Sequence, residues 1–281
     1  NNVLIIVVCA SVFLGTIYPL LIEAFTNNKI SVGEPYYNSV VIPIVIPAIL
    51  LMGVGPILSW HETNNKIKIL KEIFPIALIT LVATLLFFVF YKTYNFIGIL
   101  GIFLSFWIVL NNIFILIKKI KKNSLSMAIS HLGIGLLILG ITASSVLQDE
   151  KIMQMNYGET VKINKYTVKF IKINEISESN YVALQGIFDV SDDKNNIITK
   201  LKPENRFYPI TNIFTTEASI YSNIFGDLYM VMGKGNVNDG WTLKLYYNPL
   251  VMWIWIGALI IFFGGGIAFI KNYKKIKYYK S

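Results

Sequence analysis

The sequence contains a single cysteine, Cys9, which lies inside an apolar run and is expected to be a small buried residue. One cysteine cannot form an internal disulfide, and there is no Cys-x-x-Cys pair for redox exchange or zinc binding. Histidine is nearly as scarce, with only His61 and His131. The chain also lacks a glycine-rich phosphate loop, a His-Glu-x-x-His motif and a Gly-x-Ser-x-Gly motif, which leaves those phosphate-binding, metalloprotease and hydrolase classes without candidate residues.

Charged residues are scarce too, at 15% of the 281 residues, whereas 54% are hydrophobic. The mean hydropathy is +0.58, which soluble domains of this length rarely reach because a folded surface needs polar side chains. A membrane-spanning helix needs about 20 apolar residues. Six stretches meet this requirement and predict an α-helical multi-pass membrane protein: 3–22, 40–58, 75–91, 96–117, 127–147 and 250–270.

The lysines are distributed unevenly between the loops that join these stretches. The short loops on one side contain only Lys29 and Lys92. The positive-inside rule therefore places the other side, which holds twelve lysines, in the cytoplasm or matrix. Both ends of the chain are expected inside and residues 148–249 outside, with membrane lipid as the partner of the six helices. The twelve are Lys66, Lys68, Lys71, Lys118, Lys119, Lys121, Lys122, Lys271, Lys274, Lys275, Lys277 and Lys280.

The long outer segment differs in character from the rest of the chain. Short runs of alternating and β-branched residues, punctuated by Asn, Asp and Gly, predict a small β-barrel or sandwich. We therefore divide the chain into five membrane helices (1–147), an externally facing β domain (148–248), and a sixth helix with a basic tail (249–281). The β domain has eleven basic and twelve acidic residues, and no basic patch that would indicate a nucleic-acid partner. The runs cover 160–163, 166–173, 181–190, 196–201, 218–221, 228–232 and 241–247.

The two histidines differ in their setting. His61 lies in an inside loop beside Glu62, where a solvated imidazole is expected. His131 lies about one turn inside the fifth apolar stretch, and ionisable groups within a bilayer are costly and usually functional. Small residues on the same stretch, including Gly133 and Gly140, would let another helix or a flat cofactor come close. The residues alone leave open structural hydrogen bonding, a metal or haem ligand, and proton transfer.

A series of segments in a fixed order resembles the C-terminal half of the CcmF family, the membrane subunits of System I cytochrome c haem lyases, with NrfE as a relative. No single segment is specific, whereas the ordered set spans nearly the whole chain. The segments cover residues 14–19, 30–38, 53–56, 130–133, 140–145, 203–209, 215–218, 227–229, 246–249 and 253–257.

The resemblance implies a role in attaching haem to the two CxxCH thiols of apocytochrome c, outside the membrane. It implies haem delivery by a CcmE-type chaperone and a complex with CcmH-type and CcmI-type subunits. It also implies an intramembrane haem b, with His131 as one axial ligand to the iron. The location would be the bacterial inner membrane or the mitochondrial inner membrane.

Several functional segments of the family have no counterpart in this sequence. The tryptophan-rich WWD segment, the external histidines and the second haem b ligand belong to the N-terminal half, so that half, or a split sister subunit, is an expected partner. The chain alone is not expected to be catalytic, and no catalytic residue is assigned. Two rival hypotheses are a transporter or channel fragment and a structural assembly factor without haem. A transporter would usually show repeat symmetry or broken helices, which are not evident here.

Overall fold

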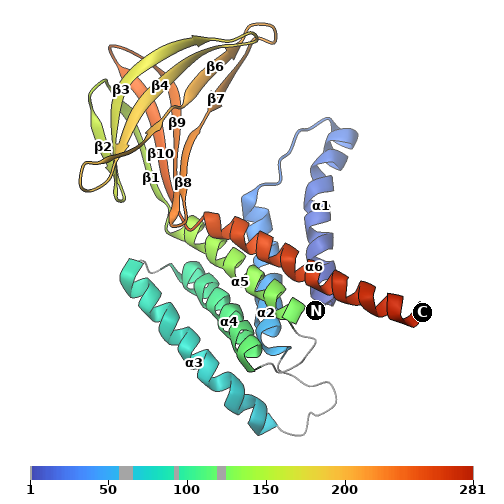
Figure 1. The fold of residues 1–281 in the computed structure, drawn as a ribbon. Helices are drawn as coiled ribbons and strands as arrows, with labels where there is room; N and C mark the ends of the chain where they lie inside the picture. The colour runs from blue at the N-terminus through green and yellow to red at the C-terminus, as the bar shows by residue number, and fades with distance from the viewer. Residues whose placement is uncertain (1, 57–65, 92–94, 119–124, 281) are drawn as a thin grey trace. The chain divides into compact units, whose positions relative to one another are not determined.

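The structure, a computed structural model, describes residues 2–56, 66–91, 95–118 and 125–280. The six expected helices are all present, and each is long and apolar enough to cross a membrane. His61 and several loop lysines lie outside the described residues. The helices are α1 (Asn2–Thr26), α2 (Glu34–Val54), α3 (Lys66–Tyr91), α4 (Phe96–Lys118), α5 (Leu125–Val146) and α6 (Met252–Lys280) (Figure 1).

Helix α2 begins earlier than its apolar run predicts. Residues 34–37, which precede the apolar stretch 40–58, form the first turn of α2. Pro35 is compatible with that position because the first turn has no intrahelical partner for its backbone N–H groups. The hydroxyl of Tyr36 donates to the Ser11 carbonyl, 3.1 Å away in α1. The tyrosine therefore joins two helices instead of serving only as an interfacial anchor.

The chain divides into two compact units. The first comprises Asn1–Lys92, Ile99–Ile138 and Gly257–Ser281, and the second comprises Thr93–Gly98 and Leu139–Ile256. The first is helical, whereas the second contains all the strands and the adjoining ends of α5 and α6.

Glycines allow the helices of the first unit to approach closely. A Cβ placed on Gly53 of α2 would overlap the indole of Trp107 in α4, and one on Gly133 of α5 would lie 2.6 Å from the Gly257 carbonyl oxygen of α6. Gly264 lies against Ser130 in the same way, whereas Gly265 has open space around it. The small residues of α5 thus accommodate neighbouring helices, as close packing in membranes requires.

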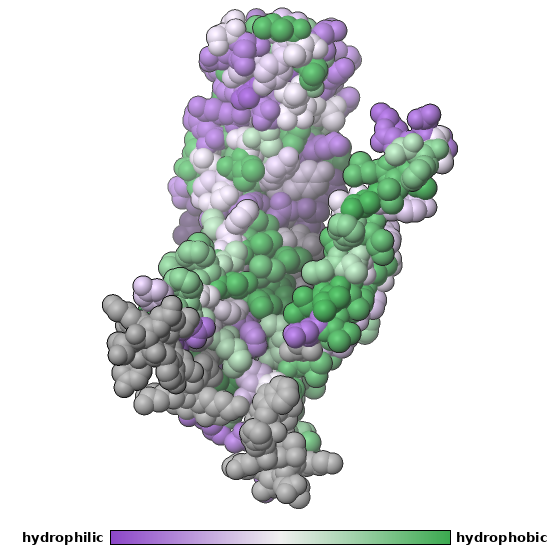
Figure 2. Space-filling model, turned by 90° about the vertical axis from the view of Figure 1, so that its right-hand side faces the viewer, coloured by the Kyte–Doolittle hydropathy of each residue, from purple (hydrophilic) through white to green (hydrophobic). Residues whose placement is uncertain are grey.

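The outward faces of the helices are strongly apolar. Figure 2 shows hydrophobic residues over much of the helical surface on the face that it draws. Gly15 is the one buried residue of α1 within the described chain, and Cys9 is exposed instead of buried. The burial of Cys9 was thus wrongly predicted, because an apolar run that faces lipid resembles one that faces a protein core.

The strands form two antiparallel sheets of a β-sandwich, as expected. One has the order β1-β10-β9-β8; the other follows β2-β3-β4-β6-β7, with β5 pairing β4. Three of the strands, β1, β6 and β7, were not predicted. The bounds are β1 (Asp149–Met155), β2 (Thr160–Ile163), β3 (Tyr166–Ser177), β4 (Val182–Ser191), β5 (Ile197–Leu201), β6 (Glu204–Tyr208), β7 (Ile213–Glu217), β8 (Ser219–Asn223), β9 (Gly226–Asn236) and β10 (Gly240–Pro249).

The core of the sandwich lies between the inward faces of the sheets. Phe170 of β3 and Phe188 of β4 stack with their ring centroids 4.4 Å apart, and Trp241 of β10 meets Phe170 edge to face. Alternate residues of β9, including Met230 and Met232, complete this fully buried cluster. The period-2 pattern of the sequence therefore corresponds to one face of each strand packing inward.

Asp227, at the start of β9, is a polar exception near this core. Burial raises the pKa of its carboxyl above the ordinary value, although a hydrogen bond with Ser222 opposes the shift. One of its oxygens is buried without a hydrogen-bond partner. The folded unit therefore favours the protonated form more than the unfolded chain does.

This shift predicts how stability depends on pH. Because the folded-state pKa of Asp227 is raised, its favourable contribution is present at pH below the unfolded value and is lost as pH rises through the folded value. We expect Asp227→Asn to raise the free energy of unfolding near pH 7 by less than about 1 kcal/mol, since solvent screens a carboxyl that is only partly buried, and to have little effect near pH 4. Thermal unfolding of both proteins at the two pH values measures this. An equal gain at both would contradict the electrostatic explanation.

Candidate functional site

His131 lies in the second turn of α5, in the helical unit. Its side chain is partly buried, and its Nδ1 atom is fully buried without a hydrogen-bond partner among the described residues. A buried polar atom without a partner is costly, and so it calls for a functional explanation. The sequence-based selection of this residue therefore coincides with an unusual feature of the structure.

The packing of α4 against α5 shows what faces His131. A Cβ on Gly135 would meet the side chains of Ile108 and Val109, and Ser105 donates to the Gly135 carbonyl. The two helices are antiparallel, since residues further along α4 meet earlier residues of α5. Ile115, for example, clusters with Ala128.

This register places two residues with unpartnered atoms, His131 and Asn112, at about the same level. His131 precedes Gly135 by one turn on the same face of α5, and Asn112 follows Ile108 by one turn on the same face of α4. Asn112 is completely buried. Its amide nitrogen donates to the Ile108 carbonyl at 2.9 Å, whereas its Oδ1 has no partner. No hydrogen bond joins the two side chains in this structure, although the Asn112 oxygen could accept from an imidazole N–H if the two came within reach.

The sequence analysis did not single out Asn112 or its neighbour Asn111. Asn111 is also completely buried, donates to the Trp107 carbonyl and leaves its Oδ1 unpartnered. A signal was present, since two adjacent amides inside the apolar run 96–117 are costly in a bilayer. Only the helix register, however, separates Asn112, on the α5 side, from Asn111.

The helical unit offers one histidine to a metal within the part of the chain that the structure describes. No group of three or more His, Cys, Asp or Glu side chains that could hold a metal ion occurs among those residues. The neutral imidazole is nevertheless a common iron ligand, and its other nitrogen is usually tied to an acceptor. A single imidazole could fill one ligand position of a haem iron, and such a haem would need a second ligand from outside the described residues.

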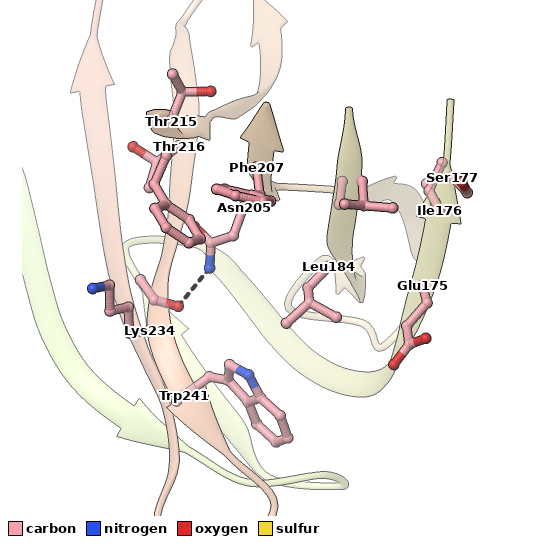
Figure 3. A pocket seen from close by; sticks show the side chains of 15 residues that line it. Glu175, Ile176, Ser177, Leu184, Asn205, Phe207, Thr215, Thr216, Lys234 and Trp241 are labelled. Carbon is pink, nitrogen blue, oxygen red and sulfur yellow. Dashed lines mark hydrogen bonds between the residues drawn. The ribbon is translucent and has the colours of Figure 1, made fainter. Parts of the chain in front are cut away.

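Outside the helices, a hollow lies in the β-sandwich. It has a volume of about 1070 Å³ and is lined by residues of β3, β4, β6, β7, β9 and β10. Figure 3 shows that Phe207 and Leu184 face this space and that Trp241 lies at its lower end. The sequence did not predict the groove, because its walls come from strands far apart in the chain.

Comparisons with known proteins agree with the resemblance seen in the sequence. Residues 146–249 match the family model described as the CcmF C-terminal beta-sandwich. The chain is 28% identical over 290 residues to the cytochrome c-type biogenesis protein CcmF of Pseudomonas aeruginosa, covering 99% of this chain and 44% of that protein. It is 32% identical over 276 residues to CcmF of Escherichia coli, covering 94% of this chain and 42% of that protein.

The fold is also similar to a solved structure, that of Cytochrome c Heme Lyase CcmF. The TM-score is 0.67 at 21% sequence identity, with 92% of this chain and 42% of that chain covered. The chain spans less than half the length of the relatives that it matches. The predicted fold class, membrane helices with an inserted β-sandwich, is therefore confirmed.

Proposed function

We propose that this chain, which corresponds to the C-terminal half of the CcmF proteins, is the C-terminal part of a cytochrome c haem lyase. Its relatives are cytochrome c-type biogenesis proteins. The bacterial relatives and the six helices indicate a multi-pass inner-membrane protein. In the proposed reaction, haem delivered by a CcmE-type chaperone is joined to the CxxCH thiols of apocytochrome c. The chain contributes structure and a haem ligand, not a catalytic group of its own.

The buried, unpartnered Nδ1 of His131 carries the proposal. We assign His131 as one axial ligand of an intramembrane haem b, bound through its other ring nitrogen. The second ligand would come from the N-terminal half of a CcmF protein or a sister subunit. When bound, haem b would supply a one-electron carrier that keeps the iron of the substrate haem reduced.

The helices around His131 give the imidazole its setting. By the helix register Asn112 lies near the level of His131 and has a buried, unpartnered oxygen. Helix α6 packs against the other face of α5 at Gly133. Fixing the ring in this way would orient its coordinating nitrogen and keep water from the iron.

We further propose that the β-sandwich faces the periplasm or intermembrane space. The strands connect the end of α5 to the start of α6, whereas the basic residues adjoin the start of α3 and the ends of α4 and α6. Lys118 and Glu72 form an ion pair of 3.7 Å at this basic end. The exposed sandwich would then be available to CcmH-type and CcmI-type subunits, the CcmE-type chaperone and apocytochrome c.

An absorption spectrum of the purified complex tests the central proposal. The chain is co-expressed with its N-terminal half, and the spectrum is recorded before and after reduction with dithionite. A b-type spectrum is expected, with one haem for each complex. A well-folded complex without haem would contradict the proposal and favour the structural or transport hypotheses.

Asn112→Leu provides a finer prediction that rests on haem binding at His131. We propose that in the haem-bound complex the Asn112 oxygen, which is unpartnered in this structure, accepts from the imidazole N–H. The substitution removes this acceptor and so lowers the basicity of the ligand. We expect haem affinity to fall by about 10–100-fold and the reduction potential to rise. Haem titration and a redox titration of the complex measure both quantities.

Asn111→Leu is the matched control, because it removes an equally buried amide from the neighbouring position of α4. It is expected to leave the reduction potential unchanged. Equal shifts in both variants would indicate a general effect of the buried amides and would contradict the role given to Asn112.

A further inference from the structure

The ladder between β8 and β9 stops halfway along β9. Its last pair is Ser219 with Met230. If the same register continued through Ala218 into β7, Thr216 would lie opposite Gly233 and Phe214 opposite Gly235. No such pairing occurs, since β7 pairs only with β6 and this half of β9 pairs only with β10. The strands separate at this point, and their facing edges form a seam.

A local irregularity coincides with the separation. Between the pairs Met232–Leu243 and Gly235–Trp241, β9 has one more residue than β10, so Gly233 and Lys234 lie opposite Thr242. Such a bulge bends its strand and often adjoins a functional site. The two glycines also carry no side chain that could cover the edge of β9.

The groove described above opens along this seam, and the residues that fail to pair form part of its wall. The Gly233 carbonyl accepts a hydrogen bond from the Asn205 side chain at 2.7 Å (Figure 3). The Gly233 carbonyl therefore points across the seam, where the Asn205 side chain supplies the hydrogen bond that a neighbouring strand would otherwise donate. Other polar groups are not satisfied, because the Trp241 Nε1–H and the Thr215 hydroxyl oxygen are buried without partners.

Trp241 is the more informative of the two groups. Its side chain is 5% exposed, and in Figure 3 its indole nitrogen faces the space enclosed by the other lining residues. An indole N–H is only a donor. An occupant of the groove must therefore combine an apolar body with hydrogen-bond acceptors at its lower end.

We propose that the seam between β7 and β9 binds an extended peptide segment of a partner protein by strand addition. The backbone of the peptide would pair with the open edge of β7, and alternate apolar side chains would enter the groove beside Leu184, Phe207 and Phe214. A peptide carbonyl that displaces the side chains beside the buried Trp241 Nε1–H would accept a hydrogen bond from it. Backbone pairing supplies affinity in this mode, and side-chain pockets supply selectivity.

The charge of Lys234, at the edge of the groove, indicates which kind of peptide would bind. Lys234 lies over the ring of Phe214, with its Nζ 5.7 Å from the ring centroid. A lysine on an open edge disfavours a wholly apolar strand, because pairing would bury its charge. The preferred segment therefore carries an acidic residue on the side of Lys234 and none on the side of Glu175, which also lines the groove (Figure 3). This binding does not require haem at His131.

A phage-displayed library of random ten-residue peptides, selected on the full chain in detergent, tests the proposal. Selected peptides are expected to alternate apolar and polar residues and to include an acidic one. N-methylation of alternate backbone nitrogens, which keeps every side chain, should weaken binding at least about tenfold. Phe214→Asp should weaken it to a similar extent, and thermal unfolding would verify that this variant is folded.

Ile210→Asp is the matched control, since Ile210 is 90% exposed in the same unit and does not line the groove. It should leave peptide affinity unchanged. Peptides that bind equally well after N-methylation, or that ignore Phe214→Asp, would overturn the proposal. The groove could instead hold a small apolar molecule or a second copy of the chain. If the selection yields no peptides, and Phe214→Asp abolishes dye binding or self-association of the chain, the peptide proposal is overturned.

Discussion

Substituting alanine for His131 is expected to remove the haem b spectrum from the complex of this chain with its N-terminal half. The imidazole is the one histidine that the described helices offer, and an alanine methyl group cannot replace it as a ligand. Haem bound per complex should fall by about tenfold or more. The reduced-minus-oxidised absorption spectrum, normalised to protein, provides the measurement, and the yield of mature cytochrome c should fall in parallel.

Two controls separate ligation from folding. His61→Ala removes the other histidine of the chain and should leave the spectrum unchanged. Adding free imidazole to the His131→Ala complex should restore part of the spectrum, because the cavity left by the side chain can admit the missing ligand. A full haem complement in His131→Ala would place the ligand elsewhere and contradict the assignment.

The helices could be predicted from the sequence because a bilayer imposes a length and an apolar composition on each of them. Their ends could not be predicted as well. Helix α2 starts at Glu34, before its apolar run, because Gly33 and Pro35 provide a favourable helix start. The exposure of Cys9 could not be predicted either, since hydropathy does not distinguish a lipid-facing side chain from a buried one.

The strands that alternate apolar and polar residues were predictable, whereas the strands fixed by long-range pairing were not. Strand β1 (Asp149–Met155) is rich in charged residues and methionine, yet it pairs along its length with β10, almost a hundred residues later. Strands β6 and β7 are short and partly exposed, so their pattern is weak. The groove depends on these strands and was therefore beyond prediction.

The candidate site, too, could be predicted from the sequence only in part. His131 stands out in the sequence because an ionisable residue in an apolar helix is unusual. The role inferred for Asn112 depends on the register of α4 against α5, which the contacts of Gly135 and Ala128 fix. Local composition contains the residue types, and tertiary packing determines which of them meet.

The second large effect is expected for Gly257→Leu, which should disrupt the packing of α5 against α6. A Cβ at this position would lie 2.6 Å from the Gly133 carbonyl and 2.7 Å from the Leu137 amide nitrogen. These are backbone atoms, so no side-chain rotation can relieve the overlap, and the helices must separate. The loss of stability should be about 3 kcal/mol or more, measured as a lower unfolding temperature in detergent.

Gly265→Leu is the matched control, because the same substitution in the same helix meets open space. It should be neutral or slightly stabilising, since leucine has the higher helix propensity by roughly 1 kcal/mol. The comparison also connects packing to function. His131 lies two residues before Gly133, so a displaced α5 should alter the haem spectrum in Gly257→Leu and leave it intact in Gly265→Leu. Equal stability of the two variants would show that α5 and α6 do not depend on this contact.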